Sequence, residues 1–400
     1  MTSEQATSGR AGLRHGRDVE VEDARSARWA TVAAFLLNGT VFGVWATQIP
    51  LIKESLGLSA AVLGGALLCL AAGALTAMIA SGPLLGRIGS APVIRVTALL
   101  FCVLLPLPGL MPDLLSLSAV LFLFGAAGGT MDVAMNAHGA LVERRLGRPI
   151  MSSLHGMWSL GGLVGAGLGG LLLQVLPPAA QAGLIAGLLL VLFLALQSRF
   201  LPSAADATGP SGSGLALPDR GTLLLGALTF LSFMSEGAVL DWSAIYLRDS
   251  LAAAAGLAGL GFAVFSGAMA TGRFCGDWLR HHLGGVTLVR IGSVLAAAGL
   301  ALTLLGGGPV TAIIGFGLTG LGLSNVVPVL FSAAGAAEDG SASRAIAAVA
   351  TLGYAGVLAG PALFGFVAEA SSVGTAFAMI AAFAVIIALA SGRAVPRPRG

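Results

Sequence analysis

The sequence is dominated by unbroken apolar stretches of about 20 residues, the length that a helix needs to cross the hydrocarbon core of a bilayer. These stretches lack the period of a helix with one polar face, and nothing in them alternates like the strands of a barrel. Of the 400 residues, 56% are hydrophobic and 10% are charged, whereas soluble domains carry about a quarter charged residues. We therefore expect an all-α membrane protein.

The apolar stretches form two groups of six, which predicts twelve transmembrane helices. Their expected centres are Asn38, Ala71, Leu100, Thr130, Val164, Leu190, Met234, Val264, Leu295, Leu321, Gly356 and Ala382. Between the groups, the composition is rich in Gly, Ser, Ala, Pro and Asp, which is typical of a flexible linker. The expected order is a disordered cytoplasmic tail (1–28), an N-terminal bundle (29–201), a cytoplasmic linker (202–220), a C-terminal bundle (221–392) and a cytoplasmic tail (393–400).

Basic residues are distributed unevenly over the predicted loops. If the amino terminus is cytoplasmic, only Lys53 and Arg248 of the 21 Lys and Arg residues lie outside. So strong a bias agrees with the positive-inside rule. We expect a multi-pass protein of the cell inner (plasma) membrane with both termini in the cytoplasm.

The two halves also repeat short segments in the same order. The pairs are Lys53 to Leu56 with Arg248 to Leu251, and Gly82 to Arg87 with Gly272 to Arg280. The six-plus-six layout, the central linker and the glycine-and-arginine loop resemble the major facilitator superfamily. That family has an acid where this chain has Gly86, whereas the second half keeps Asp277. The resemblance implies two six-helix bundles that alternate access around a midplane site. It also implies gating roles for Gly82, Arg87, Gly272, Asp277 and Arg280.

The fourth span and the loop after it resemble the fucose–proton symporter branch of that superfamily. The segments that carry this resemblance are Met131-Asp132, Asn136, Val142-Glu143-Arg144, Gly147-Arg148-Pro149 and Ser153-Leu154-His155-Gly156. The resemblance implies that Asp132 takes part in proton coupling. The second acid of that branch, in the first helix, has no counterpart here.

Ionisable side chains inside apolar spans are rare, because placing one at a helix centre costs about 2.5–3.5 kcal/mol. Asp132 and Glu236 are therefore the candidates for proton coupling. The alternative for Asp132 is a packing acid paired with a basic group or a water. The alternative for Glu236 is a structural pairing with a polar group of the first helix.

Other polar and aromatic side chains within the spans are candidates for binding a solute. They are Asn38, Gln48, Asn136, His155, Trp158, Asp241, Trp242 and Asn325. Contacts between helices explain the amides and His155 nearly as well, and Trp also anchors helices at the membrane interface. Asp241 alternatively serves the outer gate or is solvated. Gly161, Gly165 and Gly169 form a small-residue stripe, which indicates close helix packing.

Several classes of function are disfavoured. The sequence has no phosphate-binding loop of the ATP-hydrolysing kind, no clustered nucleophile and base, and no metal-ligand spacing among its three cysteines. Its basic residues form no single patch for nucleic acid. We expect no enzyme, cofactor or metal, and a monomer by family resemblance. The expected partners are a small-molecule substrate, a proton and the lipid bilayer. The expected function is proton-coupled uptake of a sugar or similar polar compound, with a proton-driven exporter of drugs or metabolites as the alternative.

Overall fold

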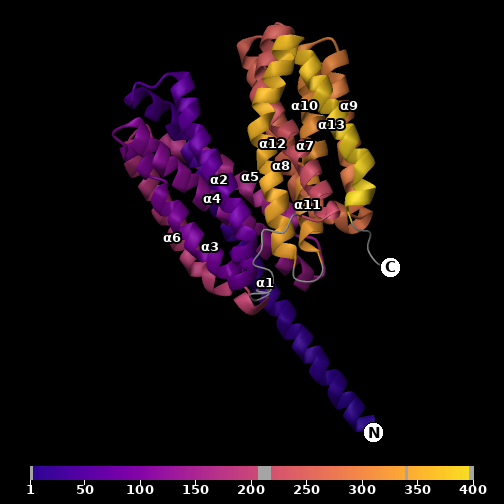
Figure 1. Cartoon of the computed structure of the whole chain (residues 1–400). Coiled ribbons are helices and arrows are strands. Elements are labelled where there is room, and N and C mark those ends of the chain that lie inside the picture. Colours follow the sequence, from indigo (N-terminus) through magenta and orange to yellow (C-terminus); the bar gives the residue numbers. More distant parts are fainter. Residues whose placement is uncertain (1–2, 206–217, 338–340, 396–400) are drawn as a thin grey trace.

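The computed structural model describes residues 3–205, 218–337 and 341–395. Over these ranges the chain consists of helices and their connections, without a β-strand. The helices form two bundles, α1 to α6 and α7 to α13 (Figure 1). The predicted all-α, two-bundle architecture is confirmed.

Each expected centre lies within a helix. The first bundle contains α1 (Ser3–Ser55), α2 (Ala60–Ile88), α3 (Ser90–Leu104), α4 (Leu114–Leu146), α5 (Met151–Leu172) and α6 (Pro178–Leu196). The second contains α7 (Arg220–Ile245), α8 (Ala255–Leu283), α9 (Gly285–Leu305), α10 (Pro309–Leu323), α11 (Val326–Gly335), α12 (Ala342–Ala370) and α13 (Val373–Ala394). By length and apolarity, ten segments of the described chain suffice to cross a membrane, with α10 and α11 counted as one. Two further helices, α5 and α8, of 22 and 29 residues, complete the two sets of six.

The amino-terminal part of α1 covers most of the segment predicted as a tail, and the helix runs without interruption from Ser3. Ala24 and Ala27 are fully buried. Small side chains three residues apart share one face of a helix, which allows this part of α1 to pack closely. Residues 206–217 of the predicted linker and 396–400 of the predicted C-terminal tail lie outside the described ranges.

The two bundles repeat one packing scheme. In the first, α1 packs along α5 and α2 along α4; in the second, α7 packs along α12 and α8 along α10. Gly89 and Gly284 turn the chain at equivalent places, after α2 and α8, with φ of 79° and 77°. This left-handed region is readily accessible only to glycine. The structure thus shows the internal repeat that the sequence segments indicate.

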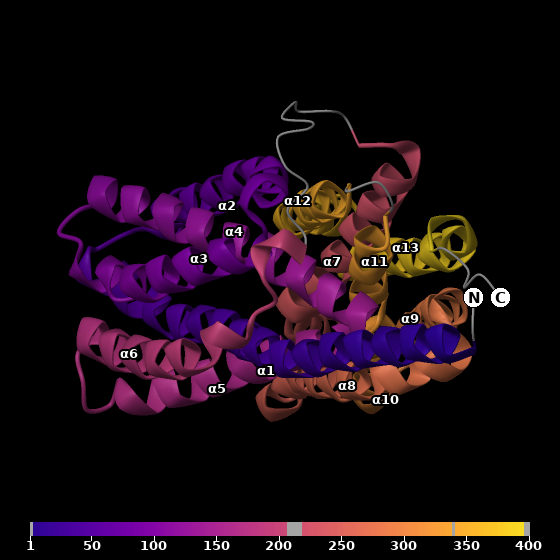
Figure 2. The ribbon, with the colours of Figure 1, turned by 90° about the horizontal axis from the view of Figure 1, so that it is seen from below.

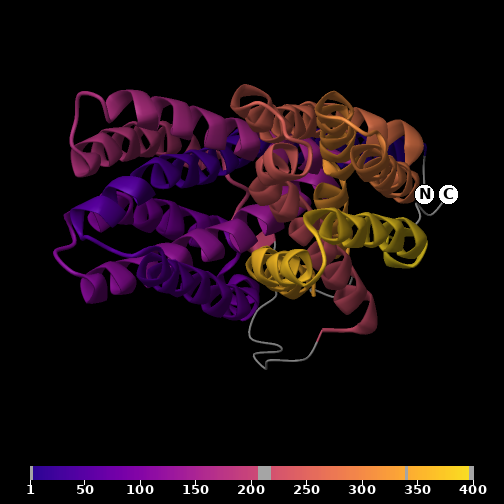
Figure 3. The same cartoon turned by 90° about the horizontal axis from the view of Figure 1, so that it is seen from above.

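The two bundles meet at one end only. We call this the inner end and define it by the turns at Gly89, Gly147 and Gly284; the opposite end is the outer end. At the inner end, α5 lies beside α8 and α2 beside α12 (Figure 2). The ribbons of the two bundles diverge toward the outer end, as Figure 1 and the view from above in Figure 3 show.

Candidate functional site

A line of buried polar groups begins on α4 and reaches α5. The Asn136 side chain donates from Nδ2 to the backbone oxygen of Asp132 at 2.9 Å, one turn earlier. Its Oδ1 atom lies 3.1 Å from Nε2 of His155. The His155 ring also contacts the rings of Phe35 and Phe331. Helical spacing places Asp132 and Asn136 on one face of α4, and that face meets α5.

The line continues from α5 into the second bundle through Arg273 of α8. Its Nη1 atom donates to the Ser159 hydroxyl at 2.6 Å, and its Nη2 atom donates to Oε2 of Glu236 at 3.1 Å. The Ser159 hydroxyl donates to the backbone oxygen of His155. We call Asp132, Asn136, His155, Ser159, Arg273 and Glu236 the polar chain. It connects both candidate coupling acids across the two halves.

Arg273 requires a correction to the sequence analysis, which counts it among the basic residues of the inner loops. The residue is 5% exposed and forms a buried ion pair with Glu236. The alternative considered for Glu236, a structural pairing with a polar group of the first helix, differs from this observed pairing with Arg273. With Arg273 removed from the predicted inner loops, Lys53 and Arg248 are still the only Lys or Arg residues predicted to lie outside.

Three atoms or groups of the polar chain lack partners. Asp132 is 7% exposed, and its carboxyl group forms no hydrogen bond or ion pair with the residues that the structure describes. Oε1 of Glu236 and Nε of Arg273 are buried and have no hydrogen-bond partner within the same described ranges. Buried polar atoms are rarely left in this state unless a ligand, a water or a conformational change supplies the partner.

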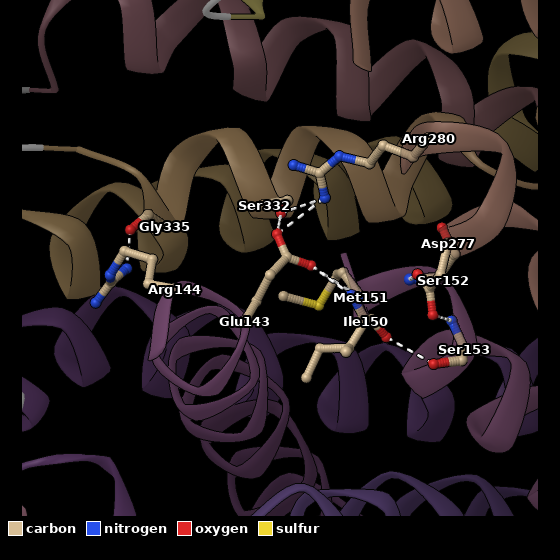
Figure 4. A network of polar contacts seen from close by, with 10 residues as sticks. All are labelled: Glu143, Arg144, Ile150, Met151, Ser152, Ser153, Asp277, Arg280, Ser332 and Gly335. Carbon is tan, nitrogen blue, oxygen red and sulfur yellow. Dashed lines mark hydrogen bonds and ion pairs between the residues drawn. The ribbon is translucent and has the colours of Figure 1, made fainter. Parts of the chain in front are cut away.

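A second polar group closes the inner end, and Glu143 of α4 lies at its centre (Figure 4). Its Oε2 atom accepts the backbone N–H groups of Ile150 and Met151 at 2.9 and 3.0 Å, within its own half. Its Oε1 atom accepts hydrogen bonds from Arg280 at 2.9 Å and from the Ser332 hydroxyl, both in the other half. One carboxylate therefore joins the two bundles.

Asp277 of α8 makes a second link across the inner end. Its two oxygens accept the backbone N–H groups of Ser152 and Ser153 at 2.9 and 3.0 Å. These groups belong to the first turn of α5, which has no partners for them within the helix. Arg144 also donates to the backbone oxygen of Gly335. We call Glu143, Asp277, Arg280, Ser332 and Arg144 the inner cluster.

The remaining predicted gating residues do not join the inner cluster directly. Gly82 faces Arg344 and Ala347 of α12 and borders a cavity of about 510 Å³ between α2, α7 and α12. Gly272 lies against the Ser324 side chain. Arg87 is exposed.

Six of the predicted solute-binding residues have other surroundings. Trp158 donates from Nε1 to Oδ1 of Asn38 at 2.9 Å, between α5 and α1, and Nδ2 of Asn38 has no partner in the described chain. Asn325 donates to the backbone oxygen of Gly272 at 2.9 Å. Gln48 is bonded at 2.9 Å to Gln181 of α6.

Near the outer end of α7, Trp242 packs against Phe364 with ring centroids 5.0 Å apart, while Asp241 is exposed. The structure therefore brings together only Asn136 and His155, with Asn38 and Trp158 as an adjacent pair on α1 and α5.

Five residues of these two groups were not predicted as site residues from the sequence: Arg273, Ser159, Glu143, Arg144 and Ser332. For Arg273 a signal existed, because an arginine ten residues before the end of an apolar helix is as unusual as an acid there. Glu143 is the last acid of its span and looks like an ordinary loop charge. Its contact with the second bundle depends on the tertiary arrangement alone.

Comparison with known proteins agrees with this architecture, although no known family profile matches the sequence. The chain is 39% identical over 379 residues to an uncharacterised MFS-type transporter of Yersinia pestis, covering 94% of this chain and 98% of the relative. It is 37% identical to an uncharacterised transporter of Sinorhizobium fredii, covering 90% and 96% of the two chains.

Among solved structures, the fucose:proton symporter of E. coli superposes with a TM-score of 0.69 at 15% identity, over 92% of this chain and 99% of the symporter. That likeness concerns the fold. With the identity to MFS-type transporters over almost its whole length, the chain is a transporter and not an enzyme, and it belongs to the major facilitator superfamily.

Proposed function

We propose that this chain is a proton-coupled secondary transporter that imports a small polar solute, such as a sugar, by alternating access. The polar chain carries this proposal, because it runs from the backbone of Asp132 to the carboxylate of Glu236 through hydrogen bonds that cross the interface of the two bundles. Charged groups at such a depth normally serve a substrate or ion pathway. The fucose:proton symporter, which shares the fold, supports uptake by analogy.

Asp132 is the proposed proton carrier. A buried carboxylate without a hydrogen-bond donor or a cation is unfavourable, and taking up a proton removes its charge. Its neighbours Asn136 and His155 bind each other through side-chain atoms, so the carboxyl group is the free member of this cluster. We assign the proton to Asp132 and the solute contacts to Asn38, Asn136, His155 and Trp158.

The inner cluster is the proposed cytoplasmic gate. Its carboxylates bind the first turn of α5 and Arg280, while the bundles diverge at the outer end. The arrangement corresponds to a transporter closed toward the cytoplasm and open to the outside. Rocking the bundles about the polar chain would separate Asp277 from Ser152 and Ser153 and open the inner end.

The proposed proton coupling through Asp132 can be tested in proteoliposomes that contain the purified protein. A pH gradient is imposed, uptake of a panel of labelled neutral and acidic sugars is measured, and exchange of the same sugars across the membrane is measured without a gradient. The variant Asp132→Asn should lose gradient-driven uptake and keep exchange, because the amide cannot carry a proton. Asp113→Asn is the matched control: Asp113 caps the start of the same helix, and Asn is an equally good cap. Full gradient-driven uptake by Asp132→Asn would rule out the proposed role.

A further inference from the structure

On the basis of the transport proposed above, we propose that the solute carries a carboxylate or an equivalent anionic group, and that Arg273 binds this group by exchanging it for Glu236. Arg273 is the only Lys or Arg among the buried side chains of residues 21–205, 218–337 and 341–395. It lies in the polar chain, where it bonds to α7 of its own bundle and to α5 of the other. A cation at this place lies where the two bundles contact each other.

A neutral solute gives no reason to keep a guanidinium group there. Removing two opposite charges from water costs several kcal/mol per ion, and apolar side chains of similar volume often stabilise a fold as well or better. Neutral sugars are recognised by amides and hydroxyls, which the polar chain already supplies. The Arg273–Glu236 pair is explained if Glu236 compensates the charge of Arg273 whenever no anionic solute is bound.

The geometry of the pair suits an exchange. A guanidinium group can hold a carboxylate through two parallel N–H groups. Here one contact of 3.1 Å joins Nη2 to Oε2, while Nε of Arg273 and Oε1 of Glu236 have no partner among the described residues. The Ser159 hydroxyl holds Nη1 in place. The edge formed by Nε and Nη2 is therefore incompletely used, and a solute carboxylate can occupy it with two hydrogen bonds in place of one.

The exchange links the solute to a proton. When the solute carboxylate binds Arg273, Glu236 loses its cation and is left as a buried anion. A proton that Asp132 delivers from the outer aqueous side neutralises it, and its O–H then donates to a neighbouring acceptor. The bound solute brings one negative charge and the proton one positive charge, so the net charge of the site is unchanged. Release of the solute toward the inside returns Glu236 to Arg273 and frees the proton on the same side.

The first test uses acetate and its neutral isostere acetamide as probes. The thermal stability of the purified full chain is measured with either probe at equal concentration, with sodium chloride keeping the ionic strength constant. In Glu236→Gln the guanidinium group has no anionic partner. Acetate should therefore raise the melting temperature of this variant above its value in acetamide by about 2–4 °C. The double variant Glu236→Gln/Arg273→Gln should respond equally to both probes.

Asp241→Asn is the matched control, because Asp241 is a second acid on α7 that is exposed and outside the polar chain. It should respond to acetate as the natural chain does. Glu236→Ala replaces Glu236→Gln if the latter does not fold. An equal response of the Glu236 variants to acetate and acetamide would show that Arg273 is a structural ion-pair partner only and would overturn the inference.

The second test uses the natural chain and three sugars that share one ring: glucuronate, glucose and glucosamine. Glucuronate should give the largest rise in melting temperature, and this rise should disappear in Arg273→Gln. A larger rise with glucose or glucosamine would overturn the inference. Proton coupling through Asp132 is measured separately with Asp132→Asn, so the solute class and the coupling mechanism can fail independently.

Discussion

Glu143 serves both bundles with a single carboxylate. One oxygen completes the first turn of α5, and the other holds Arg280 and Ser332 of the second bundle. Hydrogen bonds to a charged group contribute about 1.5–3 kcal/mol each, roughly twice as much as neutral ones. The state of the inner end therefore depends strongly on the charge of this one side chain.

We expect Glu143→Gln to loosen the closed inner end. The amide keeps the shape of the side chain but loses its charge, so its bonds to Arg280 and to the α5 backbone weaken. Amide hydrogen exchange of residues 147–156 should become about tenfold faster, which corresponds to about 1.4 kcal/mol. Arg248→Gln breaks an exposed ion pair with Asp249 at the outer end and should leave this exchange unchanged. If the amides of residues 147–156 exchange as slowly in Glu143→Gln as in the natural chain, the charge of this carboxylate does not stabilise the closed inner end.

Sequence alone identifies a buried acid, but it does not identify the partner of that acid. Asp132 and Glu236 stand out because the cost of a charge in an apolar span depends only on the residue and the span. The pairing of Glu236 with Arg273, and of Glu143 with Arg280, joins positions 37 and 137 residues apart. These pairs depend on how α7 meets α8 and how the two bundles meet, which local patterns do not encode.

At the scale of helices, close contact between α1 and α5 holds the first bundle together. A Cβ atom on Gly165 would lie 2.9 Å from the carbonyl carbon of Thr40, and one on Gly161 would lie 3.0 Å from the Thr40 nitrogen. The predicted small-residue stripe of α5 is thus confirmed. The break between α10 and α11 was not predictable, because it is stabilised by the bond from Asn325 to the backbone of α8.

Gly165→Ala should destabilise the protein by about 1–3 kcal/mol, because the added methyl group must push two backbones apart. The measurement is the thermal unfolding of the purified variant in detergent. Gly167→Ala is the control on the same helix, since nothing lies within 4 Å of a Cβ at that position. Equal melting temperatures for the two variants would contradict the close packing described here.

Asp219 fixes the start of α7 and gives it a defined pH dependence. Its carboxylate accepts the Thr222 hydroxyl at 2.6 Å and the N–H groups of Thr222 and Gly221 at 3.0 and 2.7 Å. These bonds, the one from the Thr222 hydroxyl first, hold the pKa of Asp219 below its ordinary value of 3.8. The stabilisation is therefore complete above that value and is lost as the pH falls through the lower pKa of the folded state.

Asp219→Ala should lower the free energy of unfolding by about 1 kcal/mol at neutral pH, through loss of the cap. The difference in the free energy of unfolding between this variant and the natural chain should become smaller as the pH falls below 3.8. Thermal unfolding at a series of pH values measures both effects. Asp219→Asn keeps a capping side chain without the titrating group and should show a smaller loss at neutral pH. A deficit of Asp219→Ala that grows with acid would contradict this account.

At the scale of the whole molecule, the bundles touch through α5 with α8 and α2 with α12, at related positions of the repeat. The sequence predicted two bundles from its twelve apolar spans and its linker composition. It did not predict which end is closed. Closure depends on contacts between side chains of both halves, and one sequence is compatible with either state.

A cross-link between α2 and α12 should stop transport. A Cβ on Gly82 would lie 3.2 Å from the Cβ of Ala347, compared with about 3.8 Å in disulfides. After replacement of the exposed Cys275, oxidised Gly82→Cys/Ala347→Cys should lose exchange activity in proteoliposomes and regain it on reduction. Each single variant should be insensitive to the oxidant. Full exchange in the oxidised double variant would show that α2 and α12 do not separate during transport.

The inner cluster and the Arg273–Glu236 pair lie in different surroundings. This difference affects how readily protons leak through the transporter when no solute is bound. When Asp277 leaves the α5 amides, water at the membrane surface can hydrate both partners, so this separation is readily reversible. Arg273 and Glu236 lie among apolar helices, where separation leaves bare charges that cost several kcal/mol. An empty carrier should therefore hold this pair closed and conduct few protons on its own, so that the membrane potential is not dissipated when no solute is available.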